Sequence, residues 1–275
     1  MYRRASSRRG GLPIGRILIA LVIAGFSLLS YFGTQSENTV TGEVQHVDIT
    51  PEQEIAMGIQ AAPEVADQFG GLDPNQADQA LIDDIGNQIV NRSPASTTPY
   101  QFDFHLLGDT ETINAFALPG GQIFITRALF DQLRDPGELA GVLGHEIGHV
   151  VGRHSAEQIA KARLTEGLTG AAVIAAYDPN NPSSAQTAQM AVLVGQMINL
   201  KYGREDELES DFLGVCFMND AGYDPNLMIN VMEVLRSAGG GGGQPEFLST
   251  HPDPGNRIER IQGAIQNIDQ CPGNR

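Results

Sequence analysis

Five residues, His145 to His149, constrain this chain more than any other stretch of its 275 residues. They read His-Glu-Ile-Gly-His, so two histidines stand four positions apart. Residues four apart share one face of a helix, and two imidazoles on one face can bind a single zinc ion. Glu146 lies beside them, where it can take a proton from a water held by the metal. The stretch therefore predicts a zinc-binding helix with its own general base.

The residues around this stretch indicate that the helix is buried. Apolar side chains recur along it at helical spacing, namely Leu139, Val142, Leu143, Ile147 and Val150. A surface helix that carries two histidines by chance is the alternative interpretation. Buried histidines beside a buried glutamate need a partner, however, and a metal ion supplies one.

Both ends of the helix are also marked in the sequence. Asp135 is expected as the N-cap, with Pro136 in the first turn, and Gly152 is expected to end the helix. His154 lies five residues beyond His149, which takes it off the predicted ligand face. We therefore expect His154 to have a structural role.

Catalytic zinc needs a third protein ligand and one open position. A third histidine six residues after His149 is ruled out, because position 155 is Ser. The acidic segment 204–211 offers carboxylates instead, and Glu207 and Asp211 share a helical face, on which Gly214 allows another helix to approach closely. Glu207 can then bind the metal while Asp211 orients a ligating histidine. Spacing alone barely separates Glu207 from Glu205, and an acidic solvated face is the other interpretation.

The first 32 residues combine a basic stretch with an apolar segment. All five of their arginines precede position 17, and residues 17–32 carry no charge. As a helix, 17–32 spans about 24 Å, close to the ~30 Å hydrocarbon core of a bilayer. The positive-inside rule places 1–16 in the cytoplasm. We expect a transmembrane signal anchor, with the catalytic body outside the cytoplasm, in the periplasm. A cleaved signal peptide is the second interpretation, and a transit peptide is the third.

Charge and cysteine content exclude some classes of protein. The net charge is −16 although the N-terminus is basic, so the body is too acidic for a nucleic-acid-binding protein. Cys216 and Cys271 are the only cysteines, and their spacing fits no cysteine-based zinc site. They are either two separate thiols or a disulfide that ties the C-terminus to a core helix in an oxidising compartment. The sequence does not decide between the two.

Beyond the anchor, we expect a linker at 33–50 and one metallopeptidase domain at 51–275. Helix signals and turn residues divide this domain. Helices are expected at 51–62, from Asp73-Pro74 onward, and at 135–152, 156–176, 185–219, 225–236 and 254–268, with loops at 92–99, at 178–184 and at the five glycines 239–243.

Strand signals cluster just before the metal helix. Residues 100–107 alternate between apolar and polar side chains, with His105 on the polar side and so expected at the surface. Segments 114–118 and 122–126 read as two strands around a tight Pro-Gly-Gly turn. A small antiparallel sheet is therefore expected to pack on the helix. Its edge can hold an extended peptide substrate by main-chain hydrogen bonds, and the substrate strand is expected at Asn114, Ala115 and Phe116.

Together these motifs resemble metallopeptidase family 48, and in particular its single-span or periplasmic LoiP/BepA type. The resemblance covers roughly residues 75–265. Gly203 and Ser210 depart from it, since the family often has Ser and Ala there. The motifs that carry the resemblance are His145–Val150, Arg204-x-x-Glu207-x-x-x-Asp211, Asn114-Ala115-Phe116-Ala117, Pro119-Gly120-Gly121, and Ser249-Thr250-His251-Pro252 ahead of Arg257-Ile258.

The resemblance implies an α+β, mainly α fold of the gluzincin type and assigns roles to the site residues. It makes Glu207 the third zinc ligand beside His145 and His149, and Asp211 the residue that orients a ligand. His251 has two possible roles: as a hydrogen-bond donor it can stabilise the oxyanion of the reaction, whereas the resemblance to BepA-like enzymes implies that it binds the zinc as a fourth ligand and holds the protease off. A surface histidine is the alternative.

The sequence thus predicts a membrane-anchored zinc endopeptidase with one zinc ion per chain and Glu146 as the general base. Its expected partners are the membrane and an unfolded or extended polypeptide substrate, with no nucleic acid. Envelope protein quality control is implied by the resemblance only. Two other functions stay open: a zinc-bound chaperone-like or autoinhibited binding module with little proteolysis, and a protein in which zinc is purely structural.

Overall fold

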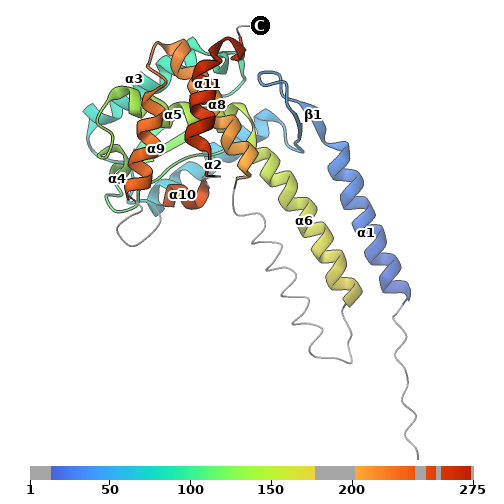
Figure 1. The fold of residues 1–275 in the computed structure, drawn as a ribbon. Helices are drawn as coiled ribbons and strands as arrows, with labels where there is room; N and C mark the ends of the chain where they lie inside the picture. Colours follow the sequence, from blue (N-terminus) through green and yellow to red (C-terminus); the bar gives the residue numbers. More distant parts are fainter. Residues whose placement is uncertain (1–13, 177–201, 239–245, 252–254, 274–275) are drawn as a thin grey trace, which may run out of the picture. The chain divides into compact units, whose positions relative to one another are not determined.

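The structure is a computed structural model that describes residues 14–176, 202–238, 246–251 and 255–273 (Figure 1). The chain forms two compact units: one comprises residues 1–35 and 159–200, the other 36–158 and 201–275. Four predictions lie wholly or partly outside the described residues: most of the basic segment 1–16, the loop at 178–184, the first part of the helix at 185–219, and the glycine run at 239–243.

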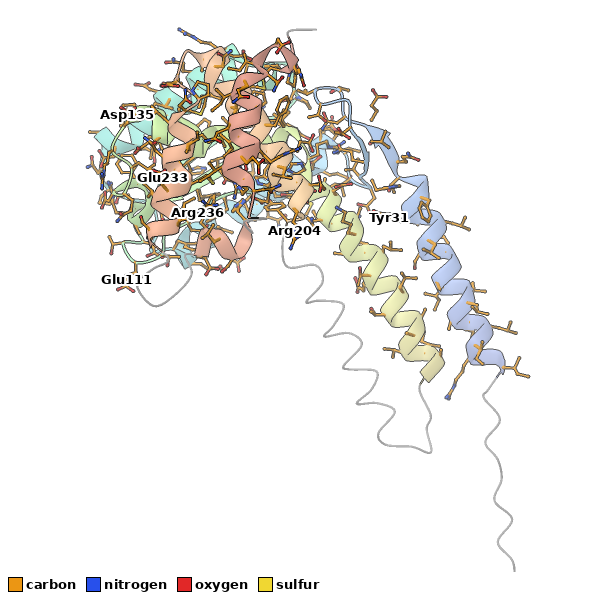
Figure 2. All side chains as sticks on the ribbon, in the orientation of Figure 1. Tyr31, Glu111, Asp135, Arg204, Glu233 and Arg236 are labelled. Atoms are coloured by element: carbon orange, nitrogen blue, oxygen red, sulfur yellow. A yellow bond between two sulfur atoms is a disulfide. The ribbon has the colours of Figure 1, made fainter. Side chains whose placement is uncertain are left out.

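The first unit contains an N-terminal apolar helix and most of a second long helix. Helix α1 spans Ile14–Gly33, and it is long and apolar enough to cross a membrane. Most of its large apolar side chains are exposed along its length (Figure 2). Helix α6 spans His154–Ala176, beginning in the second unit and ending in the first. Within the first unit α1 and α6 approach closely, because a Cβ on Gly167 would meet Ser27 Oγ. The glycine permits this contact.

The second unit is mainly helical, with two small sheets. The first sheet pairs β1, Gln35–Glu37, with β2, Val44–His46. The three-stranded sheet comprises β3, Asp103–Leu107, β4, Ala115–Ala117, and β5, Gln122–Thr126. The helices are α2 Pro51–Gln68, α3 Gln76–Arg92, η1 Pro94–Thr97, α4 Arg127–Phe130, α5 Pro136–Val151, α8 Arg204–Ala221, α9 Leu227–Ala238, α10 Glu246–Thr250, α11 Arg257–Gln266 and η3 Ile268–Gln270.

The three-stranded sheet is mixed rather than purely antiparallel. Its order is β3-β5-β4, with β4 antiparallel to β5 as expected, whereas β3 runs parallel to β5. The chain leaves β3, passes over one strand position to form β4, and returns as β5 between the two. Local alternation predicts strands but not which neighbour each one pairs with. Strand β4 is therefore an edge strand.

Helix ends follow local signals where those signals are present. The side chains of Thr50 and Gln53 cap the start of α2 reciprocally, as the sequence predicts. Helix α2 runs on to Gln68, however, through Pro63 and beyond the expected end near Ala62. At the start of α5, Asp135 Oδ1 accepts a hydrogen bond from the Gly137 amide at 2.7 Å.

Helices α5 and α8 pack together at the centre of this unit, with α9 against α5 and α11 against α8 (Figure 1). Their backbones come unusually close. A Cβ built on Gly144 would lie 3.3 Å from Gly214 O, and one on Gly148 would lie 3.0 Å from Ser210 O. Small residues at this crossing let α8 carry its acidic side chains up to the histidines of α5.

The C-terminal segment is fastened to α8. Cys216 on α8 and Cys271 after η3 form a disulfide with a Cα–Cα separation of 5.5 Å, and both are fully buried. The sequence had left this pairing open. Helix α11 lies between the two cysteines in sequence, and the bond therefore helps to hold it against α8.

Candidate metal centre

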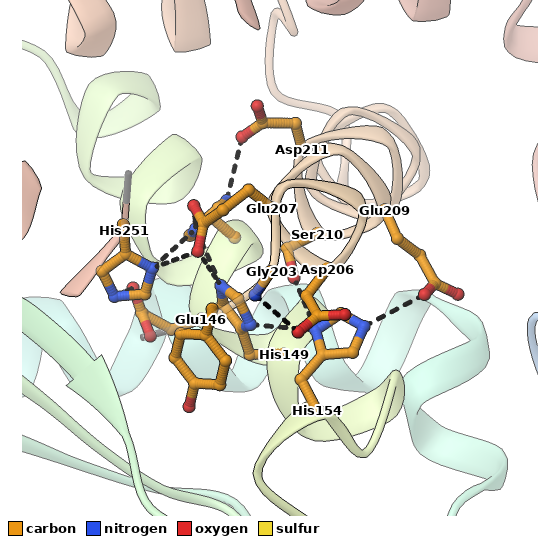
Figure 3. A network of polar contacts seen from close by, with 12 residues as sticks. Glu146, His149, His154, Gly203, Asp206, Glu207, Glu209, Ser210, Asp211 and His251 are labelled. Atoms are coloured by element: carbon orange, nitrogen blue, oxygen red, sulfur yellow. Dashed lines mark hydrogen bonds and ion pairs between the residues drawn. The ribbon is translucent and has the colours of Figure 1, made fainter. Parts of the chain in front are cut away.

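Four side chains from three parts of the chain meet at one point (Figure 3). His145 and His149 come from α5, Glu207 from α8, and His251 directly follows α10. One ligand atom of each lies within 4.8 Å of the others, and all four residues are buried. This group could hold a metal ion. We call these four residues the metal cluster.

The distances within the metal cluster suit a tetrahedral ion. His145 Nε2 lies 3.1 Å from His149 Nε2 and 3.5 Å from Glu207 Oε2. His149 Nε2 lies 3.4 Å from Glu207 Oε1. Ligand atoms bound to one tetrahedral zinc at about 2.0–2.1 Å stand about 3.3 Å apart. The atoms are therefore already spaced as ligands of one ion.

His251 presents Nδ1 to the same point. Nδ1 lies 3.0 Å from Glu207 Oε1 and 3.4 Å from His145 Nε2. The ring stacks on Phe247 with a centroid separation of 4.4 Å, and the residue is fully buried. The interpretation of His251 as a surface histidine is wrong.

Glu146 is the most isolated charged group of the centre. It is completely buried, and no described residue donates a hydrogen bond to either of its carboxylate oxygens. Burial raises the pKa of this carboxyl. The His251 ring is close to it, with Nε2 3.7 Å from Glu146 Oε1. A carboxylate held in this way, with both oxygens free, is suited to accepting a proton from a reacting group.

Asp211 and Arg257 lie behind His145. Asp211 Oδ1 lies 3.0 Å from His145 Nδ1, the nitrogen that faces away from the cluster. Arg257 donates to both carboxylate oxygens of Asp211, at 2.7 and 2.6 Å, and lies 3.2 Å from Glu207 Oε2. Arg257 is fully buried. Sequence reasoning used it only as part of a motif and gave it no place in the site.

The pKa values of the two histidines of α5 are shifted in opposite directions. Burial opposes a charge on His145, but its contacts to Asp211 and Glu207 overcome this and raise its pKa to about 9. Burial dominates at His149 and lowers its pKa well below the ordinary value. Burial also opposes ionisation of Glu207 and Asp211, yet the neighbouring cations, chiefly His251 and Arg257 respectively, hold both pKa values low. The carboxylates are thus charged in advance of any metal.

His154 lies outside the metal cluster, as its expected position off the ligand face predicts, but it contacts His149 from behind. Its Nδ1 lies 2.9 Å from His149 Nδ1, and its Nε2 lies 3.0 Å from Glu209 Oε2 (Figure 3). Helix α5 ends at Val151 and α6 begins at His154, and the turn between them places the His154 ring against His149, a contact that helical spacing does not predict. The other acidic candidate, Glu205, is exposed and takes no part in the metal cluster.

The expected substrate strand lies next to the centre. Asn114 is buried with Oδ1 unpaired among the described residues, and Ala115 and Phe116 belong to the edge strand β4. The carbonyl of Ile113 accepts a hydrogen bond of 3.2 Å from the amide of Phe247, the ring that stacks on His251. Phe247 therefore connects Ile113, shortly before β4, to His251 of the metal cluster.

Comparison with known proteins gives consistent matches. A model described as peptidase family M48 matches residues 76–265. The mitochondrial metalloendopeptidase OMA1 of Schizosaccharomyces pombe is 31% identical over 218 residues, 78% of this chain and 62% of that protein. The beta-barrel assembly-enhancing protease of Escherichia coli is 33% identical over 183 residues, 64% of this chain and 37% of that protein. The chain thus spans less than two thirds of these relatives.

Proposed function

Since the chain belongs to peptidase family M48, we propose that it is a zinc-dependent endopeptidase that cleaves extended polypeptides. His145, His149 and Glu207 hold the metal, and Glu146 is the general base. The observation that carries the proposal is the buried carboxylate of Glu146, which has no hydrogen-bond partner among the described residues, beside a set of ligand atoms spaced for one ion. The two relatives described above are named as a metalloendopeptidase and a protease, which agrees with this role.

Two imidazoles and one carboxylate form a ligand set typical of catalytic zinc. Zinc held by these three residues would supply Lewis acidity toward a scissile carbonyl and would lower the pKa of a water to about 7. Glu146 takes the proton of the attacking water and then gives it to the leaving amine. Asp211 accepts a hydrogen bond from His145 and fixes the orientation of its ring, while Arg257 keeps Asp211 ionised.

The edge of β4 supports binding of the substrate in extended form. Asn114 directs its main-chain N–H and C=O to Thr126 of β5, and because such pairs alternate along an antiparallel ladder, Ala115 is the residue of this segment that offers its main-chain groups at the free edge of β4. An added strand there receives main-chain hydrogen bonds with little demand on its sequence. Because Ile113 and Phe247 link this strand to His251, a bound peptide passes close to Glu146.

His251 supports a second candidate function, in which the centre is held inactive. Its Nδ1 lies 3.4 Å from His145 Nε2 and 3.0 Å from Glu207 Oε1, so His251 would be able to serve as a fourth ligand where a catalytic zinc needs an open position. In that state the protein binds polypeptides with little cleavage. Replacement of His251 by Ala separates the roles, because release of a lock raises proteolysis, whereas loss of oxyanion stabilisation lowers it.

The location we propose is a membrane facing an oxidising compartment. The apolar helix α1 and the arginines before it support a single span with the N-terminus in the cytoplasm. The buried Cys216–Cys271 disulfide supports a periplasmic body. Removal of damaged or misassembled envelope proteins is the biological task that fits this placement.

The direct test of the proposed chemistry is Glu146→Gln, assayed on casein with metal content measured in parallel. The variant is expected to keep its metal and lose cleavage. Glu138→Gln is the matched control, because Glu138 is also a buried glutamate of α5 but bonds to the amide of Arg134, away from the metal cluster. Normal cleavage by the Glu146 variant would remove the proposed general base.

A further inference from the structure

We propose that His154 and Glu209 are positioning residues for the metal ligand His149, a role that rests on the proposed zinc site. The three residues form a chain of contacts that we call the His149 relay. His149 Nδ1 meets His154 Nδ1 at 2.9 Å, and His154 Nε2 meets Glu209 Oε2 at 3.0 Å (Figure 3). The relay joins the metal cluster to a carboxylate at the edge of the protein.

The hydrogen positions in the relay follow from the requirement that His149 bind the metal. His149 Nε2 faces the metal cluster, so it must present a lone pair, and the proton is then on Nδ1. His154 Nδ1 accepts that proton's hydrogen bond, which places the proton of His154 on Nε2. Glu209 accepts from Nε2 and thereby fixes this tautomer. The Ser210 hydroxyl, 3.2 Å from His154 Nδ1, can share the same acceptor.

A special backbone turn brings His154 into place. Arg153 has φ 58°, and among the described residues it is the one that is not glycine and has a positive φ. This conformation is costly for a residue with a Cβ. It ends α5 and turns the chain back, so that α6 starts with His154 behind His149. Gly152 leaves room for the ring, because a Cβ there would lie 2.5 Å from His154 Nε2.

Contacts from a distant part of the chain hold this turn. Arg153 donates to Glu54 Oε1 from Nε at 2.9 Å and from Nη2 at 2.6 Å, and Nη2 also donates to the carbonyl of Ile49 at 2.8 Å. Tyr100 donates a further hydrogen bond to Glu54 Oε1 at 3.1 Å. Glu54 itself is almost fully buried. These contacts hold the left-handed turn at Arg153, and the turn in turn fixes the position of the His154 side chain.

The two histidines of α5 are thus oriented by different devices. Asp211, whose carboxylate is paired with the buried Arg257, contacts His145 directly. His149 instead contacts the imidazole of His154, and the supporting carboxylate of Glu209 lies one residue further from the metal cluster. Glu209 lines a cavity of about 440 Å³ together with Glu205, Asp206 and Arg260, and its side chain is 23% exposed. Glu209 can therefore be replaced with little disturbance to the core.

The test measures zinc affinity of the full-length protein in detergent, by competition with a chromophoric chelator. His154→Phe keeps a ring but removes the acceptor, and we expect affinity to fall about 10- to 100-fold, the usual effect of losing a ligand-orienting partner. His154→Asn keeps an acceptor near the Nδ1 position and should recover most of the loss. The absorption spectrum of the cobalt-substituted protein should shift in the Phe variant and return in the Asn variant.

A second pair of variants covers the case in which His154→Phe does not fold. Glu209→Ala should weaken zinc binding, by less than His154→Phe, whereas Glu205→Ala, which removes the same charge from the same helix and cavity, should leave it unchanged. Equal affinities for wild type and both His154 variants, or equal effects of the two glutamate variants, would overturn the relay. Absence of zinc binding by the wild type would instead overturn the proposed metal site.

Discussion

Replacement of Arg257 by Met is the perturbation for which the structure gives the clearest magnitude. The guanidinium is fully buried, binds Asp211 through two hydrogen bonds of 2.7 and 2.6 Å, and lies 3.2 Å from Glu207. Methionine has a similar length and fills most of the space without the charge. The variant therefore leaves Asp211 buried with its main counter-charge removed, and it takes one of several partners from Glu207.

Breaking a buried ion pair by removing one partner costs about 3–5 kcal/mol. In the metal-free protein His145 can replace part of the lost charge, because its pKa of about 9 keeps it protonated at neutral pH and it lies 3.0 Å from Asp211. We therefore expect the lower end of that range, about 3 kcal/mol. This is a large share of the 5–15 kcal/mol that stabilises a typical domain.

Urea unfolding at neutral pH, followed by circular dichroism with a chelator present, measures this loss. With a slope of about 1–3 kcal/mol per molar urea, the midpoint should fall by about 1–3 M. The double variant Arg257→Met with Asp211→Asn removes the orphaned charge and should recover much of the stability. A single variant that loses less than about 1 kcal/mol, or a double variant no more stable than the single one, would refute the assigned role of Arg257.

Three further predictions concern the disulfide, the contact between α5 and α8, and the N-terminal helix α1. Reduction of the Cys216–Cys271 bond, or the double variant Cys216→Ser with Cys271→Ser, should lower the free energy of unfolding in urea by about 4 kcal/mol, because the bond closes a loop of 55 residues. No effect of reductant on this free energy would show that the bond does not form. Gly214→Ala places a Cβ 3.1 Å from the backbone N of His145, so it should separate α5 from α8 and weaken zinc binding. Gly263→Ala on α11, which has open space around it, should leave zinc binding unchanged. Equal zinc affinities of the two variants would contradict the close packing of α5 and α8. Deletion of residues 1–33 should move the protein from the membrane to the soluble fraction of cells that express it, and retention in the membrane would argue against α1 as the anchor.

The metal helix could be predicted from the sequence because its signals are local. The expected span from Asp135 to Gly152 matches the observed caps of α5, since an N-cap, a first-turn proline and an apolar stripe act within a few residues. The motif that contains Glu207 and Asp211 also lies within one helix, and the structure brings both side chains to the histidines of α5.

What the sequence could not supply depends on contacts between distant residues. The left-handed turn at Arg153 is held by Glu54, almost a hundred positions earlier, so His154 could not be placed from helical spacing. Arg257 reaches Asp211 from another helix, and nothing local distinguishes it from a surface arginine. The parallel pairing of β3 with β5 is likewise a choice among neighbours that strand patterns do not encode.

The most direct test of the whole account is the zinc content of the purified full-length protein, compared between wild type and Glu207→Gln. The account predicts close to one zinc ion per chain in the wild type and a large loss in the variant, because Glu207 joins two helices at one ion. Asp206→Asn is the control, since Asp206 caps α8 one residue earlier and lies outside the metal cluster. A wild type without zinc, or a Glu207 variant that retains it fully, would contradict the central claim.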